Sequence, residues 1–495
     1  MKALFRKLTV AIVAIVAVCA AGFFAGCELE DDAFTGIRFT KDGCYAEAGS
    51  EVYVSAVFIN NDKENKNAVI KYSIDADLSD STGSFLDKTS AASGEAIKLT
   101  LGSKVGITVI KAEYDTYTAR TACGVEAETI SINDKPIGFA QFGVEPSKMK
   151  TVVTVSNAAD LKKYAKQGGC LIYVDGVIDM SEGILPIEGK TMDGNNATPA
   201  MNAFIASNSE YSTYDDWIKN MTTNSWINSH LNDKGDTNTL SISNTYKNKI
   251  QIQIASNTAI IGLPGAVIRG VNFSIKSNNV VIRNLTLKDS VDPFPHHENG
   301  DGWNAQHDLI SIDKGTNIWI DHCSFEDTLN LGTAANGEKW QIYDGLCDMK
   351  SSATNITVSY CVFKNHDKTM LIGSGDSDGD NTKRFITLAN NYWLNCGQRC
   401  PFVRNSRIHV YNNVYDSDAY RHWTSQTSIN ARAGSIVCAQ NNYFGSVTSQ
   451  NEQGGTIYIS DSAIFDLAPK YGYVLRKTSS DLRNLAGPGK LSVTK

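Results

Sequence analysis

The second half of this 495-residue chain repeats one short apolar pattern six times. Within each nine-residue window, apolar residues alternate with polar ones at the period of a β-strand, and no helix-forming segment lies between successive windows. One such strand cannot bury its own apolar face, so the repeats must stack. The windows NVVIRNLTL, NIWIDHCSF, NITVSYCVF, FITLANNYW, RIHVYNNVY and IVCAQNNYF begin at Asn279, Asn317, Asn355, Phe385, Arg407 and Ile436. The pattern predicts an all-β domain built as a parallel β-helix.

Successive windows begin 38, 38, 30, 22 and 29 residues apart, so the loops differ in length while the strands keep a common register. Equivalent positions of stacked coils lie about 4.8 Å apart. Cys323 and Cys361 share the seventh window position and are predicted to be stacked buried thiols, with a disulfide as the alternative. Three asparagine pairs also share their positions and predict a hydrogen-bonded ladder: Asn390/Asn391, Asn412/Asn413 and Asn441/Asn442.

Three carboxylates occupy the same part of the repeat on adjacent coils. Asp308 lies in HDLISI, and Asp344 and Asp348 lie in YDGLCDMK. Neighbouring carboxylates without positive partners repel one another, and a bound calcium ion is the usual way in which this repulsion is relieved. Straight strand geometry would separate Asp344 from Asp348 by roughly 13 Å, too far for one ion, unless Gly345 permits a bend. The alternative is that these are solvated turn carboxylates.

Three cations follow on the next coils. Lys368 lies in NHDKTMLIGS, and Arg399 and Arg404 lie in CGQRCPFVR. Taken singly, each is expected to be a solvated surface charge, but beside the carboxylates they predict a groove for an acidic, calcium-bridged ligand. Cys396 and Cys400 match no metal-binding spacing, and a local disulfide is the alternative to free thiols.

Several ordered motifs resemble those of one known family. The segments are DPFPHHE, GWNAQHDLISI, NIWIDHCSFED, YDGLCDMK, NITVSYCVFKNHDKTMLIGS, QRCPFVR and IHVYNN. From about Thr151 to Gly489 the chain is similar to the polysaccharide lyase family 1 pectate lyases. The resemblance implies a right-handed parallel β-helix that cleaves de-esterified α-1,4-polygalacturonate (pectate) by calcium-dependent β-elimination, leaving 4,5-unsaturated oligogalacturonides.

The resemblance also implies roles for single residues. It places calcium at Asp308, Asp344 and Asp348, the base at Arg399, and the substrate-carboxylate partners, which also assist catalysis, at Lys368 and Arg404. Gln306 stands where some members have a further acid, which leaves the calcium shell open. A free guanidinium keeps its proton up to about pH 12.5–13.8. An arginine base, surrounded by cations, therefore predicts activity that rises into alkaline pH.

Other functions remain as alternatives. Pectin lyase, which takes methyl-esterified substrate without calcium, is disfavoured by the three acids. A hydrolase would need a pair of acids around the bond without basic neighbours. A non-catalytic surface adhesin that binds carbohydrate is the alternative from another class. The net charge of −7 and the motifs argue against nucleic acid as a partner, and we expect a monomer.

The first 27 residues are interpreted as an export signal. A basic start precedes an apolar run from Leu8 to Phe24, and Ala25-Gly26-Cys27 resembles a bacterial lipobox. We therefore expect lipidation at Cys27, with the membrane reached only through this anchor, on the outer membrane or the cell surface. The alternatives are ordinary secretion and an uncleaved anchor.

The mature chain is predicted to have two domains. Residues 28–135 alternate at strand period and resemble a bacterial Ig-like module, interpreted as a β-sandwich spacer with a weak binding module as the alternative. Cys44 and Cys123 bracket this module and are candidates for a disulfide. A linker is expected over 136–149 and the catalytic domain over 150–495, with a long surface insertion at 190–250. The run GDSDGDN at 375–381 is interpreted as a turn, with a second calcium site as the alternative.

Overall fold

A computed structural model describes nine stretches of the chain: 34–40, 44–125, 129–230, 237–298, 300–417, 427–445, 447–458, 473–475 and 479–495. The predicted signal segment and Cys27 lie outside these stretches. Among the described residues, no helix is both long and apolar enough to cross a membrane. The chain divides into two compact units, the first formed mainly by residues before Thr129.

The first unit consists of short, mostly antiparallel sheets around one hydrophobic core. Ile70 and Ile110 of one sheet and Leu99 of another are fully buried in that core. Strand pairing places Cys44 beside Cys123, but the side chain of Cys44 is outside the description, so the disulfide stays a prediction. The sheets are β1-β4-β5, β2-β11-β10-β6-β8 and β3-β9-β7. Their strands are β1 (Gly36–Phe39), β2 (Cys44–Ala46), β3 (Glu51–Val54), β4 (Ala56–Asn60), β5 (Lys63–Glu64), β6 (Val69–Ile74), β7 (Phe85–Leu86), β8 (Ser90–Ala92), β9 (Ile97–Thr100), β10 (Gly106–Tyr114) and β11 (Tyr117–Val125).

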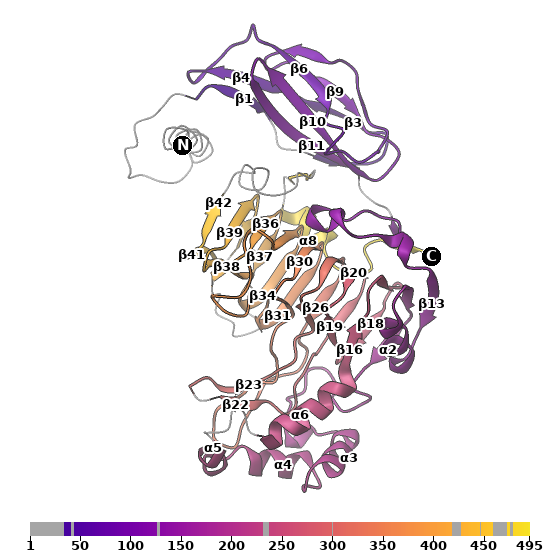
Figure 1. Ribbon diagram of the computed structural model, residues 1–495, viewed down its shortest axis with the longest axis vertical. Helices are drawn as coiled ribbons and strands as arrows, with labels where there is room; N and C mark the ends of the chain where they lie inside the picture. The colour runs from indigo at the N-terminus through magenta and orange to yellow at the C-terminus, as the bar shows by residue number, and fades with distance from the viewer. Residues whose placement is uncertain are drawn as a thin grey trace. The chain divides into compact units, whose positions relative to one another are not determined.

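The second unit is the predicted parallel β-helix (Figure 1). Its first sheet contains β13 (Thr151–Val155), β14 (Cys170–Val174), β17 (Thr258–Gly262), β20 (Asn278–Arg283), β25 (Thr316–Asp321), β30 (Thr354–Ser359), β33 (Phe385–Ala389), β36 (Arg407–Tyr411), β39 (Ile436–Gln440) and β42 (Thr456–Tyr458). Six of these strands coincide with the repeat windows. The predicted register is confirmed, since Phe385 pairs with Arg407 and Ile318 with Ile356.

Each coil adds a strand to two further sheets. The second sheet contains β15 (Val177–Asp179), β18 (Val267–Arg269), β21 (Thr286–Lys288), β26 (Ser324–Glu326), β31 (Val362–Lys368), β34 (Tyr392–Gln398), β37 (Val414–Asp416) and β40 (Tyr443–Phe444). The third sheet contains β16 (Gln251–Ile254), β19 (Asn272–Ile275), β24 (Ile310–Asp313), β29 (Cys347–Lys350), β32 (Leu371–Ile372), β35 (Phe402–Arg404), β38 (Thr427–Arg432) and β41 (Thr448–Gln453). Smaller elements are the hairpins β22 (His296–Glu298)/β23 (Gly302–Asn304) and β27 (Gly332–Thr333)/β28 (Lys339–Trp340), the 3-10 turn η3 (Gly194–Asn196) and the helix α8 (Ser479–Leu485).

Stacked side chains bind the coils together. The amide of Asn412 donates to Asn390 at 3.0 Å, and that of Asn413 donates to Asn442 at 3.0 Å, so the predicted ladder is confirmed. Cys323 and Cys361 are buried and free, so the disulfide alternative is wrong for this pair. A row of stacked rings adds to the core: Phe325, Phe363, Trp393, Tyr415 and Phe444, with centroids 4.4–5.6 Å apart.

The polar stretch 190–250 is more ordered than the sequence suggests. It forms the helices α3 (Pro199–Asn208), α4 (Tyr214–Met221), α5 (Asn224–His230) and α6 (Thr237–Ile250). The hydroxyls of Thr198 and Thr213 cap α3 and α4 by accepting backbone N–H groups. Trp217 packs against Phe294 and Trp340, so these helices share a hydrophobic core with loops of the β-helix. The helices lie beside the β22–β23 hairpin in Figure 1.

Residues 129–149 form a strap across the outer face of the first sheet. The strap consists of β12 (Thr129–Ser131), η1 (Gly138–Phe142) and η2 (Pro146–Lys148), and β12 pairs with the C-terminal strand β43 (Ser492–Thr494). Backbone N–H groups of η1 donate to the hydroxyls of Thr357 and Thr387 at 3.1 Å. Gly138 has a φ of +65°, and a Cβ there would lie 2.3 Å from the Thr387 hydroxyl. The second unit thus begins at Thr129 and includes the whole strap, whereas the sequence predicted a linker over 136–149.

A helix lies in sequence between the first two strands of the first sheet, β13 and β14, and contacts β14 and β16. The helix α2 (Ala158–Gln167) is capped by the side chain of Asn157, which accepts the N–H of Asp160 at 2.9 Å.

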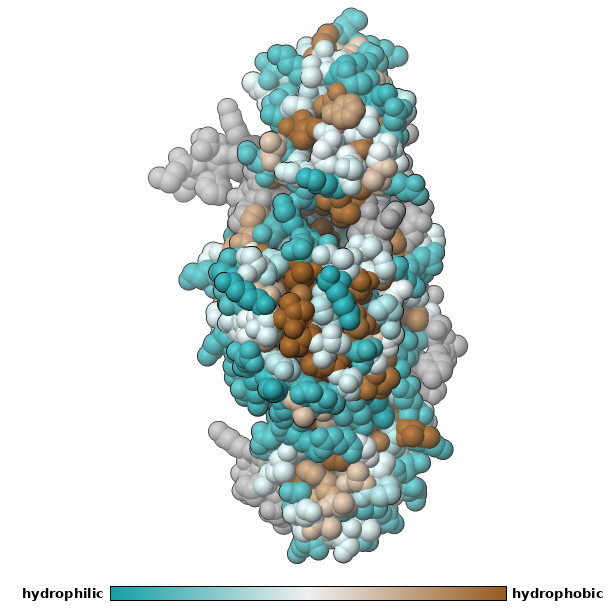
Figure 2. All heavy atoms as spheres, turned by 90° about the vertical axis from the view of Figure 1, so that its right-hand side faces the viewer, coloured by the Kyte–Doolittle hydropathy of each residue, from teal (hydrophilic) through white to brown (hydrophobic). Residues whose placement is uncertain are grey.

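Hydrophobic side chains also reach the surface of the molecule, and appear brown in Figure 2. Val152, Val177 and Ile187, all on the first coils, are among the most exposed. The predicted site residues lie on later coils.

Candidate active site

Two of the predicted calcium-binding acids converge on Gly345. Asp308 lies just before β24 and Asp348 lies within β29, and both carboxylates are almost completely buried. The N–H of Gly345 donates to Asp308 Oδ1 at 3.1 Å, and the N–H of Leu371 donates to Asp348 Oδ1 at 2.9 Å. A Cβ at position 345 would lie 2.4 Å from Asp348 Oδ1 and 2.9 Å from Asp308 Oδ1. Only glycine therefore fits between the two acids.

The third acid, Asp344, lies outside the strand. Because β29 begins only at Cys347, straight-strand geometry does not govern the distance between Asp344 and Asp348. Burial and the charge of Asp308 raise the pKa of Asp344 to about 7, although Lys350, Lys368 and Arg399 act in the opposite direction. These interactions place Asp344 among both the acids and the cations. Burial and the same neighbouring carboxylate also raise the pKa of Asp348 well above its ordinary value.

Lys350 is a site residue that the sequence interpretation missed. Its Nζ lies 3.5 Å from Asp308 Oδ2 and 3.8 Å from Asp348 Oδ2. Burial would lower the pKa of Lys350, but the charges of Asp308 and Asp348 raise it instead. The signal was present in the spacing, since Lys350 follows Asp348 by two residues and so shares its strand face.

Lys368 and Arg399 meet at the turn between the second and third sheets. Lys368 ends β31 and pairs in register with Gln398, the residue before Arg399. The Lys368 ammonium donates to Asn304 Oδ1 at 2.9 Å, so the β22–β23 hairpin orients it. Arg399 has a φ of +58°, and its guanidinium makes no hydrogen bond or ion pair with the described residues. The structure therefore brings Lys368, Arg399 and Asp344 into one cluster.

A buried histidine holds the main chain of this cluster. His366 Nδ1 lies 2.6 Å from Asp327 Oδ2, and Nε2 lies 2.6 Å from the carbonyl oxygen of Asp344. A carbonyl only accepts, so Nε2 carries a proton. Burial would lower the pKa of His366, but Asp327 raises it to about 9. Sequence reasoning missed this residue, although the 38-residue spacing of the repeat places Asp327 and His366 on adjacent coils, one position out of register.

Arg404 and Gln306 have partners other than the three acids. The Nε of Arg404 lies 2.7 Å from Asp376 Oδ1, and its Nη1 donates to the carbonyl of Gly373 at 2.9 Å. Gln306 contacts His296 Nδ1 at 2.8 Å. Asp376 belongs to the 375–381 run, whose other acids also bind protein groups, as when Asp378 pairs with Arg384 at 3.0 Å. The turn interpretation of that run therefore holds for these described acids.

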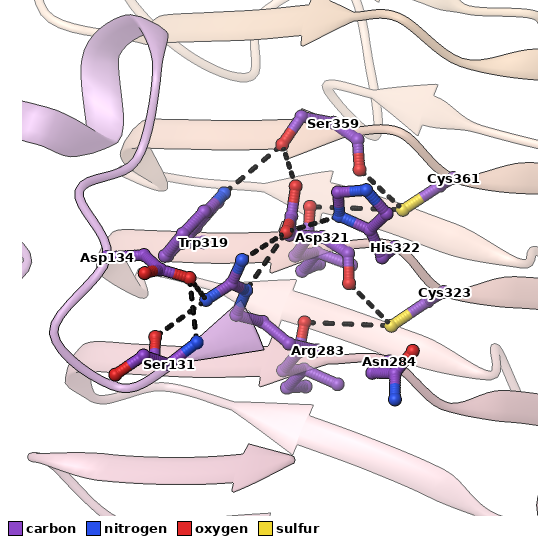
Figure 3. A network of polar contacts seen from close by, with 12 residues as sticks. Ser131, Asp134, Arg283, Asn284, Trp319, Asp321, His322, Cys323, Ser359 and Cys361 are labelled. Atoms are coloured by element: carbon purple, nitrogen blue, oxygen red, sulfur yellow. Dashed lines mark hydrogen bonds and ion pairs between the residues drawn. The ribbon is translucent and has the colours of Figure 1, made fainter. Parts of the chain in front are cut away.

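The Asp–His pair in WIDH is structural (Figure 3). Asp321 binds His322 at 2.7 Å, Arg283 at 2.9 Å and the Ser359 hydroxyl at 2.6 Å. Burial alone would raise the pKa of Asp321, but His322 and Arg283 hold it at about 2. Arg283 also reaches the strap through Asp134 at 2.8 Å. The network fastens the strap to the first sheet and offers no open position for a substrate.

The thiols of CGQRCPFVR take no part in the cluster. Cys396 and Cys400 are both free, and Cys400 is buried. Burial raises the pKa of the Cys400 thiol well above its ordinary value, which makes a poor nucleophile or metal ligand. The local disulfide considered for this pair is therefore wrong.

The carboxylates of Asp308 and Asp348 suit a cation such as Ca²⁺, although the protein side chains alone do not form a complete set of ligands. Within the described residues, no group of three or more His, Cys, Asp or Glu side chains converges closely enough to hold a metal ion. Asp308 and Asp348 nevertheless both face the ammonium of Lys350, and a glycine clears the space between them. Carboxylate oxygens are the donors that Ca²⁺ prefers, and Ca²⁺ accepts further ligands from water or substrate.

Comparison with known proteins identifies the family. The profile of the family described as "Pectate lyase" matches residues 188–466, more than half of the chain. A pectate lyase of Bacillus subtilis is 34% identical over 287 residues, which cover 55% of this chain and 65% of that protein. Pectate lyase E of Dickeya chrysanthemi is 43% identical over 185 residues, covering 35% and 46%. The chain thus spans less than two thirds of the length of these curated relatives.

A solved structure described as "Pectate lyase bound to hexasaccharide" superimposes with a TM-score of 0.53 at 29% identity. The superposition covers 73% of this chain and 98% of the chain of the solved structure. The fold, the ordered motifs and the profile match agree with one another. The chain belongs to the pectate lyase family.

Proposed function

We propose that this chain is a calcium-dependent pectate lyase that cleaves de-esterified α-1,4-polygalacturonate by β-elimination. The observation that carries the proposal is the cluster in which Asp344 lies among Asp308, Lys368 and Arg399. Acids and cations on one wall match a substrate that is itself a polyanion bridged by cations. The curated relatives are named pectate lyases, and one solved neighbour is bound to a hexasaccharide.

Asp308, Asp344 and Asp348 are the proposed calcium ligands. When bound there, calcium would neutralise the acids and draw electron density from a substrate carboxylate. Lys368, oriented by Asn304, supplies a second positive charge to the same carboxylate. A carboxylate whose charge is compensated in this way makes the C5–H bond beside it more acidic.

Arg399 is the proposed base. Among the described residues, no hydrogen-bonded carboxylate competes with a substrate for its guanidinium. The base removes the C5 proton, the electron pair of the C5–H bond forms the C4–C5 double bond, and the glycosidic oxygen leaves C4 with its electron pair. Arg404 is the proposed partner of a further uronate carboxylate, which it would bind in exchange for Asp376.

The N-terminal quarter of the chain has a proposed role in placing the enzyme. We propose that the chain is exported, that Cys27 carries the lipid anchor at the outer membrane or cell surface, and that the first unit acts as a spacer. Metabolic labelling with a fatty acid tests this, because Cys27→Ala should abolish incorporation. Continued labelling of that variant would contradict the anchor.

Product analysis tests the lyase reaction. Mass spectrometry of oligomers released from polygalacturonate distinguishes elimination from hydrolysis, because hydrolysis adds one water per bond and elimination adds none. The proposal predicts unsaturated oligogalacturonides. Saturated oligomers would indicate a hydrolase, products only from methyl-esterified pectin would indicate a pectin lyase, and binding without products would indicate an adhesin.

A further inference from the structure

The turn that follows β32 presents a carboxylate to Arg404, one of the proposed substrate-binding residues. Oδ1 of Asp376 lies 2.7 Å from Nε of Arg404 and 3.4 Å from Nε of Arg432. No other carboxylate among the described residues forms an ion pair with Arg404. The hydrogen bond from Arg404 lowers the pKa of Asp376, so this carboxylate is ionised at neutral pH. Arg404 therefore already has a carboxylate partner within its own chain.

The backbone of this turn is anchored, whereas the side chain of Asp376 is not. Asp378 accepts the N–H of Ser374 at 2.7 Å and pairs with Arg384 at 3.0 Å. The side-chain amide of Asn405 donates to the carbonyl oxygen of Asp376 at 2.8 Å. The side chain of Asp376 is 59% exposed. A change of rotamer can therefore move this carboxylate from Arg404 into solvent without breaking the bonds that hold the turn.

Arg404 has supports that do not depend on Asp376. Its Nη1 donates to the carbonyl oxygen of Gly373 at 2.9 Å, and its central guanidinium carbon lies 4.5 Å from the centre of the Phe402 ring. The side chain of Arg404 is only 15% exposed. These contacts keep the guanidinium in place when its carboxylate partner changes, which lowers the entropy cost of binding a new one.

We propose that Asp376 is a specificity-determining residue, whose carboxylate occupies the position at Arg404 that a substrate carboxylate takes and must leave before the substrate binds there. The inference rests on the proposed function, in which Arg404 binds a uronate. A carboxylate tethered to the chain competes at an effective concentration on the order of millimolar or higher. A single uronate displaces it poorly, whereas an oligomer that is also held by calcium and Lys368 displaces it readily. Asp376 thus weakens binding and restricts it to ligands with several uronates.

The variant D376N tests this role, because it removes the charge and keeps the size of the side chain. D380N is the matched control, since Asp380 lies in the same turn but pairs with Lys383 at 3.0 Å. Initial rates on trigalacturonate are measured from the absorbance of the unsaturated product in saturating calcium. We expect D376N to lower KM about threefold, as for loss of an exposed ion pair, with kcat changed by less than about twofold. D380N should leave KM unchanged.

Calorimetry of hexagalacturonate binding measures the same competition without turnover. In the R399A background, D376N should tighten binding about threefold, and in R399A/R404Q it should have little effect, because no guanidinium is left to compete for. An equal gain in both backgrounds would indicate general charge repulsion and would overturn the inference.

The remaining outcomes separate the inference from the proposed function. If Asp376 only orients Arg404, D376N raises KM and weakens binding, and either result overturns the inference alone, as does a KM equal to that of D380N. A wild-type chain that releases no unsaturated product overturns the proposed function instead, and the calorimetric comparison still decides whether Asp376 competes with a uronate ligand.

Discussion

Calcium binding should depend steeply on pH between 6 and 8. In the metal-free protein, burial and the charge of Asp308 raise the pKa of Asp344 to about 7. A carboxylate must lose its proton before it can bind the ion, so protons and calcium compete at this residue. The affinity for calcium is therefore expected to reach its maximum above the pKa of Asp344 and to fall as the pH drops through that pKa.

The size of the effect follows from that pKa. At pH 8 about nine tenths of Asp344 is ionised, and at pH 6 about one tenth, so the apparent affinity should fall about tenfold. Asp348, whose pKa burial and Asp308 also raise, should make the fall steeper. At pH 6, binding one calcium ion should release close to one proton from Asp344.

Titration calorimetry without substrate measures both quantities. Calcium is titrated into the full chain at pH 6, 7 and 8 in two buffers of different ionisation enthalpy, which reveals the number of protons released. D344N is the control, because it removes the titrating group and should bind more weakly with a shallower pH dependence. An affinity that stays constant from pH 6 to pH 8, with no proton release, would refute the reasoning.

Three further perturbations test separate parts of the account. R399A should lower kcat by at least about a thousandfold with KM little changed, as expected for loss of a base. A large increase in KM with kcat little changed would contradict that role. D327N should replace the buried negative partner of His366 by a neutral amide and weaken calcium binding about tenfold in calorimetry, whereas unchanged affinity would contradict a positioning role for this pair. A chain beginning at residue 129 should keep the thermal stability and activity of the β-helix, whereas one beginning at 150 should lose both, and equal behaviour of the two would contradict the role of the strap.

The repeat made the fold predictable. Windows with strand-period alternation located six strands of the first sheet and their mutual register, because every coil must bury the same positions. The asparagine ladder followed from the same register. The strap could not be predicted in this way, because its contacts with Thr357 and Thr387 join residues more than 200 positions apart in sequence.

The helices of the 190–250 stretch were missed for another reason. They are short, and their packing depends on rings supplied by distant loops, such as Phe294 and Trp340. Local sequence therefore carried only a weak periodic signal, and tertiary packing decided the outcome.

The candidate site was predictable in its residue types but not in its pairings. The motifs indicated Asp308, Asp348 and Lys368, which the structure places on adjacent coils near the turn between the second and third sheets. Lys350 was missed, because a single basic residue at the end of a strand is usually a solvated charge. The stacking of coils shows that its ammonium faces Asp308 of the neighbouring coil as well as Asp348 of its own strand.

The central claim is that this cluster performs calcium-dependent elimination on pectate. The most direct test incubates the full chain with polygalacturonate and follows the ultraviolet absorbance of the unsaturated uronide, first with calcium and then after addition of a chelator. The account predicts a steady rise in absorbance with calcium and its arrest by the chelator. No rise in either condition, or a rise on methyl-esterified pectin that the chelator does not affect, would contradict it.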